Sequence, residues 1–375
     1  MDMERQALRT PLCGRLGIEY PICLAGMGSR GRATPPKLVS AVSNAGGLGV
    51  IGGSGLSPEH LRACIQEVRS LTDRPFGVDL LLPVSLAETG DTRSAVREQL
   101  RREYPKHVAF VQSLMREFNL PDAYTERKRL VTRKNVKELV EVVLEEKVPV
   151  FAAALGDPSW VVPLAREQGI TVFGMAGSVR HARRQMEAGV DIVVAQGFEA
   201  GGHTGRIANF PLIPQVVDVV TPTPVIAAGG IGDGRGVAAA LALGAVGAWV
   251  GTAFLVAEEC EIPDLHKEDI LRGASEDFPT SRSSTGKPVR QYKNVVMDAW
   301  ENSDLDPLPM PLQGALMEDL VDAAHQAGRQ DLINNPAGQI GGLLKESKPA
   351  ARIMDDLVLG ALEVLQRLQG FSAMT

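Results

Sequence analysis

One histidine of the chain stands inside a glycine-rich stretch that suits proton transfer. His203 lies in the heptapeptide EAGGHTG, which runs from Glu199 to Gly205 and follows an apolar run. Glycines have no side chains to block a flat ring, so the imidazole can face a cavity. An imidazole near its unperturbed pKa of ~6.5 exchanges protons at neutral pH. We therefore predict a catalytic role for His203, with a structural histidine as the alternative, and predict no such role for the other histidines.

Two further glycine clusters favour a phosphate site. Gly229 and Gly230 lie in the segment AAGGIGDG, while Gly251 and Thr252 lie in VGTAF, and both segments close apolar runs. Glycines let backbone N–H groups approach phosphate oxygens, and a helix N-terminus favours their negative charge. The Thr252 hydroxyl can donate a hydrogen bond as well. Glycines that serve tight turns alone are the alternative.

An acidic residue, Asp79, interrupts the apolar run PFGVDLLL. A polar side chain in such a run needs a hydrogen-bond partner. The carboxylate could accept a hydrogen bond from the ring N–H of a ligand, or it could bond to the backbone inside the protein. Both interpretations stay open.

Eight short apolar runs must position these residues, at 21–26, 47–53, 75–82, 148–155, 170–176, 190–197, 223–230 and 245–251. Continuous apolar runs are typical of parallel strands covered on both faces. Helical patterns separate them, which indicates repeated βα units. Eight units in succession favour an α/β fold, the closed (β/α)₈ TIM barrel, over an open doubly wound sheet. In such barrels the active site lies at the C-terminal ends of the strands, where the glycine clusters fall.

We predict a single domain over residues 14–375. Two segments of it depart from the alternation of strands and helices. Residues 84–134 form a charged, helix-prone insertion after the third strand. It would rise over the C-terminal mouth, either as a packed decoration or as a lid. Residues 275–375 form a C-terminal extension. We expect a polar loop at 275–293 and a helix at 351–368 that packs back on the barrel.

Composition excludes several classes of function. The net charge is -6 without a block of like charges, which argues against a nucleic-acid surface. The N-terminus lacks the apolar region of a signal peptide, and no run reaches ~18 apolar residues, so we expect no membrane association. The four cysteines show no zinc or disulfide spacing, which favours reduced thiols and a cytoplasmic protein without a metal.

These motifs together resemble the nitronate monooxygenase family, formerly called 2-nitropropane dioxygenases. The resemblance covers residues from about 14 to 260 and again 335–368. Its motifs are PICLAGMG at Pro21, SNAGGLGVIGG at Ser43, PFGVDLLLP at Pro75, AQGFEAGGHTG at Ala195, PVIAAGGIGDGRGVAAALALGA at Pro224 and VGTAFL at Val250.

The resemblance implies FMN, bound non-covalently across the barrel mouth. Residues Ala25, Gly26 and Met27 would supply backbone along the flavin ring, and Asp79 stands where the family usually has asparagine. The ribityl chain and ring would be lined by Gln196, Gly201 and Gly202. The implied phosphate site comprises Gly229, Gly230, Trp249, Val250, Gly251 and Thr252.

The activity implied by the resemblance is oxidation of alkyl nitronates by O₂ to a carbonyl compound and nitrite, with His203 as catalytic base. Relatives with the same motif suggest an alternative, in which NAD(P)H reduces an apolar enoyl thioester or a quinone. A protein that binds FMN or a fatty acid with little activity is an alternative of another class. It is motivated by Asp79 and by the absence of a lysine at residues 152–154. A homodimer formed through the C-terminal helix is left open.

Overall fold

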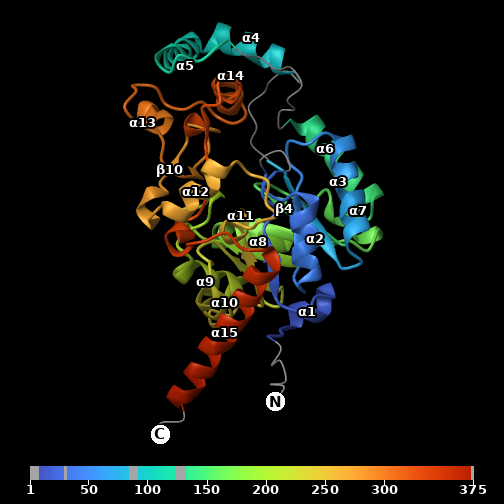
Figure 1. The fold of residues 1–375 in the computed structure, drawn as a ribbon. Helices are drawn as coiled ribbons and strands as arrows, with labels where there is room; N and C mark the ends of the chain where they lie inside the picture. Colours follow the sequence, from blue (N-terminus) through green and yellow to red (C-terminus); the bar gives the residue numbers. More distant parts are fainter. Residues whose placement is uncertain (1–7, 29–31, 84–91, 123–131, 373–375) are drawn as a thin grey trace.

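The computed structural model describes residues 8–28, 32–83, 92–122 and 132–372. Its centre is a parallel barrel of eight strands, one in each predicted run, so the predicted fold class is confirmed (Figure 1). Neighbouring strands follow the order β1-β9-β8-β6-β5-β4-β3-β2, and a parallel bridge between Cys23 and Leu48 closes the ring from β1 to β2. The strands are β1 (Ile22–Leu24), β2 (Gly49–Gly52), β3 (Phe76–Leu81), β4 (Val150–Ala154), β5 (Thr171–Ala176), β6 (Ile192–Gln196), β8 (Val225–Ala228) and β9 (Gly247–Val250).

Helices follow most strands and cover the outside of the barrel. Several start at a hydroxyl side chain that accepts a backbone N–H, as Ser57, Thr132 and Ser178 do, which satisfies a donor left free at the helix start. The outer helices are α2 (Pro36–Asn44), α3 (Pro58–Leu71), α6 (Arg133–Glu145), α7 (Val162–Glu167), α8 (Val179–Glu187), α9 (Asn209–Val220), α10 (Gly234–Ala242) and the short α11 (Thr252–Leu255).

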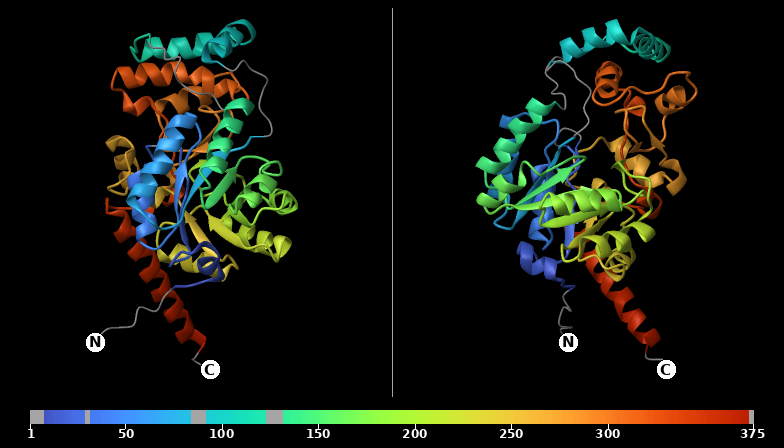
Figure 2. Two further views of the ribbon diagram at one scale, coloured as in Figure 1. Left: turned by 90° about the vertical axis from the view of Figure 1, so that its right-hand side faces the viewer. Right: turned by 180° about the vertical axis from the view of Figure 1, so that it is seen from behind.

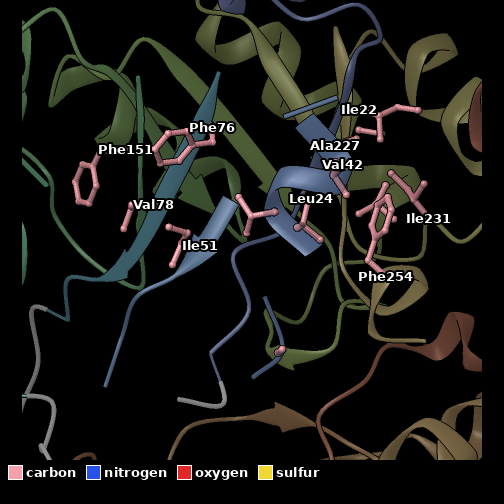
Figure 3. Packing of buried hydrophobic residues seen from close by; sticks show 14 of the residues in the cluster. Ile22, Leu24, Val42, Ile51, Phe76, Val78, Phe151, Ala227, Ile231 and Phe254 are labelled. Carbon is pink, nitrogen blue, oxygen red and sulfur yellow. The ribbon is translucent and has the colours of Figure 1, made fainter. Parts of the chain in front are cut away.

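The apolar runs bury both faces of the strands in two separate layers. Outward side chains such as Ile22, Leu24 and Ile51 pack against the surrounding helices (Figure 3). The alternate side chains, including Phe173 and Trp249, fill the barrel interior. The helix α1 (Pro11–Leu16) adds Leu12 and Leu16 to that interior cluster and closes the N-terminal end. A reaction site is therefore confined to the opposite end of the barrel, where the strands terminate.

The insertion after β3 packs on the C-terminal extension. Its described helices are α4 (Arg93–Glu103) and α5 (Pro105–Glu117), which lie against α14 (Leu312–Gln326) at the end of the molecule farthest from the chain termini (Figures 1 and 2). Val96, Leu100, Trp300 and Leu316 share one apolar cluster there, separate from the barrel core. Of the predicted insertion, residues 84–91 and 123–131 lie outside the described residues, and 133–134 already belong to α6.

The segment predicted as a loop at 275–293 contains two short strands. These are β10 (Thr280–Ser281) and β11 (Val289–Arg290), which form a three-stranded antiparallel sheet with β7 (Gly202–His203). Strands of two residues are too short for an alternating pattern, so the loop prediction was incomplete here. The sheet attaches the extension directly to the histidine motif.

The other elements of the extension complete its fold, and they include the predicted C-terminal helix. That helix, α15, packs against α10, where Gly234 permits close approach to Gly360 and Ala361. No helix within the described ranges has both the length and the apolarity to span a bilayer. The remaining elements are α12 (Asp264–Arg272), η1 (Ser275–Asp277), α13 (Val295–Glu301), η2 (Gln330–Leu332), η3 (Gln339–Leu343) and α15 (Ala350–Ser372).

Candidate active site

A cavity of about 1260 Å³ lies at the C-terminal ends of the barrel strands, and the C-terminal extension forms part of its wall. The fold brings nearly all of the predicted site residues to this cavity, although they come from six different strands or strand ends. Its lining includes Ala25, Gly26, Met27, Asp79, Gln196, Gly201, Gly202, His203, Gly229, Gly230, Trp249, Gly251 and Thr252.

Val250 is the predicted residue that the fold does not bring to the cavity wall. Its side chain is buried in the outer layer, between strand and helices. Its carbonyl instead accepts a hydrogen bond from the backbone N–H of Ala25 at 2.8 Å. Trp249, the preceding residue, points into the barrel interior and lines the cavity from below. Val250 therefore ties the first and last barrel strands together, while its neighbours line the cavity.

His203 is held by contacts on both its backbone and its ring. The side-chain amide of Gln196 donates to the His203 carbonyl at 2.6 Å. The ring Nε2 lies 3.0 Å from the hydroxyl oxygen of Thr285. Burial, together with the nearby charge of Lys287, lowers the pKa of His203 to about 4. The imidazole is therefore neutral at pH 7 and can accept a proton or a hydrogen bond.

A buried arginine fixes the glycine-rich motif around His203. The Arg290 guanidinium donates to the carbonyl of Phe198 from two nitrogens, at 3.2 and 3.0 Å, and also to the carbonyl of Phe278. On the same strand, Val289 pairs with His203 and Arg290 with Gly202. The motif is thus a strand of a small sheet whose other strands come from the C-terminal extension.

The turn after β8 has the backbone geometry expected of an anion cradle. Gly229 and Gly230 both have positive φ, at 92° and 68°, a region that side chains other than glycine rarely adopt. The side-chain amide of Asn209 donates to the carbonyl of Gly229. The Glu199 carboxylate accepts the backbone N–H of Asn209 at 3.1 Å, which places its negative charge at the N-terminus of α9.

Thr252 and the segment around Gly338 close the same end of the cavity. The Thr252 hydroxyl accepts a hydrogen bond from the backbone N–H of Gly338 at 2.8 Å, and it keeps its own proton to donate. A Cβ atom added to Gly201 would lie 2.6 Å from the backbone of Ala337. The backbone of the C-terminal extension therefore packs directly on the histidine motif, which requires a glycine at residue 201.

Asp79 lies in the wall of the cavity. Its side chain is buried, and a Cβ atom on Gly26 would come within 2.2 Å of it. Among the described residues, none donates a hydrogen bond to the Asp79 carboxyl group. Burial alone raises its pKa to about 8. At neutral pH this group is largely an uncharged acid that faces a ligand site, not the backbone-bonded group of the alternative interpretation.

The sequence analysis missed several residues of the cavity wall. Thr285 and Lys287 come from the polar segment 275–293, and their place opposite His203 follows from strand pairing across more than eighty residues of chain. Such long-range pairing leaves no local signal. His266, predicted to have no role, also lines the cavity, with its Nε2 3.1 Å from the Pro336 carbonyl.

Comparison with known proteins agrees with this geometry. The sequence profile of the nitronate monooxygenase family matches residues 9–360. The Mycobacterium tuberculosis protein Rv1533, named as a monooxygenase, is 40% identical over 97% of this chain and 99% of its own length. A Staphylococcus aureus protein named as a nitronate monooxygenase is 33% identical over 94% of this chain and 97% of its own.

Two solved structures are similar over nearly the whole chain. The nitroalkane oxidase of Streptomyces ansochromogenes has a TM-score of 0.81 at 29% identity, and the match covers 95% of this chain and 99% of that one. FabK of Thermotoga maritima has a TM-score of 0.77 at 32% identity, and the match covers 97% of this chain and 99% of that one. Both likenesses extend over the barrel and the C-terminal extension together.

Proposed function

Because the chain belongs to the nitronate monooxygenase family, we propose that this oxidoreductase converts alkyl nitronates and O₂ into a carbonyl compound and nitrite. The observation that carries the proposal is the placement of His203. Its neutral imidazole lies in the wall of a cavity at the C-terminal mouth of the barrel, with the hydroxyl of Thr285 at Nε2. An imidazole so placed can bind and orient the nitro group of a small substrate.

The cofactor of this reaction in our proposal is FMN. Enzymes of the family depend on a flavin, and three features of the cavity fit one. The glycine turn at Gly229 and Gly230 exposes backbone N–H groups for a phosphate. The segment from Ala25 to Met27 offers backbone beside a flat ring, and the Asp79 carboxyl group there receives no hydrogen bond from the described part of the chain. A bound flavin would take electrons from the substrate and pass them to O₂.

The state of His203 bears on which form of the substrate is bound. A conjugate-acid pKa of about 4 makes the imidazole a weak base in the site as it stands. Abstracting a proton from a neutral nitroalkane needs a stronger base than holding an anion that has already lost it. A nitronate would also raise the pKa of His203 by its own negative charge. We therefore assign His203 to hydrogen bonding and proton exchange with a bound nitronate.

Anaerobic rapid mixing tests the proposal. The purified yellow protein is mixed separately with propyl-2-nitronate and with NAD(P)H, and the absorbance of the oxidised flavin is followed. We expect fast bleaching by the nitronate, no bleaching by NAD(P)H, and nitrite formation once air is admitted. Bleaching by NAD(P)H alone would reject nitronate oxidation as the activity.

A second candidate function is NAD(P)H-dependent reduction of an enoyl thioester or a quinone. One observation favours it, the likeness to FabK of Thermotoga maritima. The same mixing experiment separates the two, because each predicts a different reductant. A protein inert to nitronate, NAD(P)H and quinones would instead support the remaining alternative, a protein that binds FMN or a fatty acid.

A further inference from the structure

A lysine that the reaction described above does not use lies in the cavity wall beside His203. Lys287 lines the same cavity, on the segment that leads into β11. The backbone N–H of Thr204 donates to the carbonyl of Pro288 at 3.3 Å, so this segment runs directly alongside the histidine motif. The ammonium charge is close enough to His203 to disfavour a positive charge on the imidazole. Both side chains therefore address the same region of the cavity.

The residues that the structure describes supply no counter-charge in contact with this ammonium. Lys287 is half-buried, and within the described part of the chain it forms no ion pair or side-chain hydrogen bond. Of the acidic groups that line the cavity, Glu199 accepts the backbone N–H of Asn209, and Asp79 is held largely protonated by burial. The other charged groups of the wall are Asp157, Arg184, Glu187 and Glu318. A bound anion would give this ammonium the charged partner that the described residues do not provide.

We propose that the Lys287 ammonium is the anion-binding group of this cavity and selects the nitronate anion over the neutral nitroalkane. The inference rests on the proposed function and deepens it by naming the charge of the substrate. The two side chains divide the work: Lys287 supplies the positive charge, and the neutral imidazole of His203 supplies a directional hydrogen bond. Lys287 touches the substrate without exchanging a proton with it.

Steady-state kinetics with propyl-2-nitronate test this assignment. Replacing Lys287→Met should raise KM by about 10- to 100-fold, the loss expected for one hydrogen bond to a charged group, while kcat changes by only a few-fold. Lys287→Arg should restore most of the affinity because it keeps the charge. The matched control is Lys345→Met, which removes an exposed lysine of the extension that does not line the cavity. An unchanged KM in Lys287→Met, or an equal rise in Lys345→Met, would overturn the proposal.

A binding measurement separates the failure of this inference from the failure of the proposed function. Sodium nitrate is a planar anion that is not turned over, and its binding to the flavin-loaded proteins is followed by titration calorimetry at constant ionic strength. We expect the wild type to bind nitrate and Lys287→Met to bind it at least 10-fold more weakly. That result without nitronate turnover would reject the proposed function and keep the anion site. If the wild type turns over nitronate but does not bind nitrate, the anion site alone is rejected. The same conclusion follows if Lys287→Met binds nitrate as tightly as the wild type.

Discussion

The hydroxyl oxygen of Thr285 lies 3.0 Å from Nε2 of His203, and the two residues are 82 positions apart in the chain. The same oxygen accepts the backbone N–H of Lys287 at 3.3 Å, so the hydroxyl is itself fixed. Because a hydroxyl can donate as well as accept, this contact holds the ring in one orientation with either tautomer. We therefore expect Thr285 to act through His203 as a positioning residue for the imidazole.

The first prediction concerns this contact. Thr285→Val keeps the shape of the side chain and removes the hydroxyl, so the imidazole loses the contact that holds its orientation. We expect kcat with propyl-2-nitronate to fall about 5-fold while flavin content is unchanged, since one hydrogen bond is worth ~1 kcal/mol. The neighbouring Ser284→Ala is the control, because the buried Ser284 hydroxyl has no hydrogen-bond partner among the residues that the structure describes. Equal losses in the two variants would contradict a positioning role for Thr285.

The second prediction concerns the pH dependence that His203 imposes. Its pKa is lowered to about 4, so the imidazole stays neutral at neutral pH and becomes charged only in acid. We expect kcat/KM to be level from about pH 6 upward and to fall as the pH approaches 4. His203→Ala should lower kcat/KM by ~10²–10⁴-fold and abolish this acid limb, with flavin content retained because backbone groups hold the cofactor. The exposed His60→Ala serves as the control. A fall in kcat/KM centred near pH 6.5 would show that burial does not lower the pKa of His203.

Local patterns in the sequence were sufficient for the barrel. Each strand run is continuously apolar, and burial on both faces is what that pattern requires, so Ile22 and Cys23 face opposite layers as neighbours in one run. The residues at strand ends followed from the same reasoning, because parallel strands bring their C-terminal ends together. This is why Asp79 and His203, which stand in different strands, could be placed in one cavity from their motifs alone.

The rest of the site could not be read from the sequence because it depends on contacts between distant segments. Thr285 and Lys287 stand in a polar segment without periodicity, and only the pairing of Val289 with His203 brings them to the cavity. The protonation of Asp79 also has no local signal. Its pKa follows from how completely the fold excludes water from it, which is a property of packing.

The third prediction concerns the protonation of Asp79. Burial raises the pKa of Asp79 to about 8, well above the ~3.9 of an unfolded chain. The associated stability is fully present below pH ~4 and is lost as the pH rises through about 8. Between pH 6 and 9 the flavin-free wild type should lose roughly 2 kcal/mol of stability that Asp79→Asn keeps, since asparagine cannot ionise. Thermal unfolding at both pH values measures this difference. Asp304→Asn, which changes an exposed carboxylate, should behave as the wild type; an identical pH response of Asp79→Asn would mean that Asp79 ionises freely.

The fourth prediction tests the phosphate cradle. Gly230→Asp places a negative charge and a Cβ atom at a residue with φ of 68°, within 3.2 Å of the Glu199 side chain. We expect the purified protein to lose most of its flavin, because the new carboxylate would repel a phosphate at the same turn. Gly328→Asp is a matched control, since Gly328 has the same φ and an added Cβ would meet no atom within 4 Å. A Gly230→Asp protein with full flavin content would place the phosphate elsewhere.

The fifth prediction decides between a packed decoration and a lid for α4 and α5. The Arg93 guanidinium is fully buried and pairs with Asp322 at 2.5 Å and with Asp319 at 2.7 Å, which fastens α4 to α14. Arg93→Met removes this buried ion pair, a change that costs about 3–5 kcal/mol locally. We expect faster hydrogen exchange in α4 and α5, whereas the exposed Arg102→Met should have little effect.

The kcat/KM of the same Arg93→Met variant decides whether α4 and α5 are a packed decoration or a lid. No described residue of α4 or α5 lines the cavity, whose wall is completed by the C-terminal extension through Thr285, Lys287 and Gly338. Loosening the two helices should therefore leave kcat/KM for propyl-2-nitronate within about two-fold of the wild type, since the loss of stability is confined to the unit that α4 and α5 form with α14. A fall in kcat/KM that parallels the increase in hydrogen exchange would show that the helices act on the cavity from above α14, as a lid does.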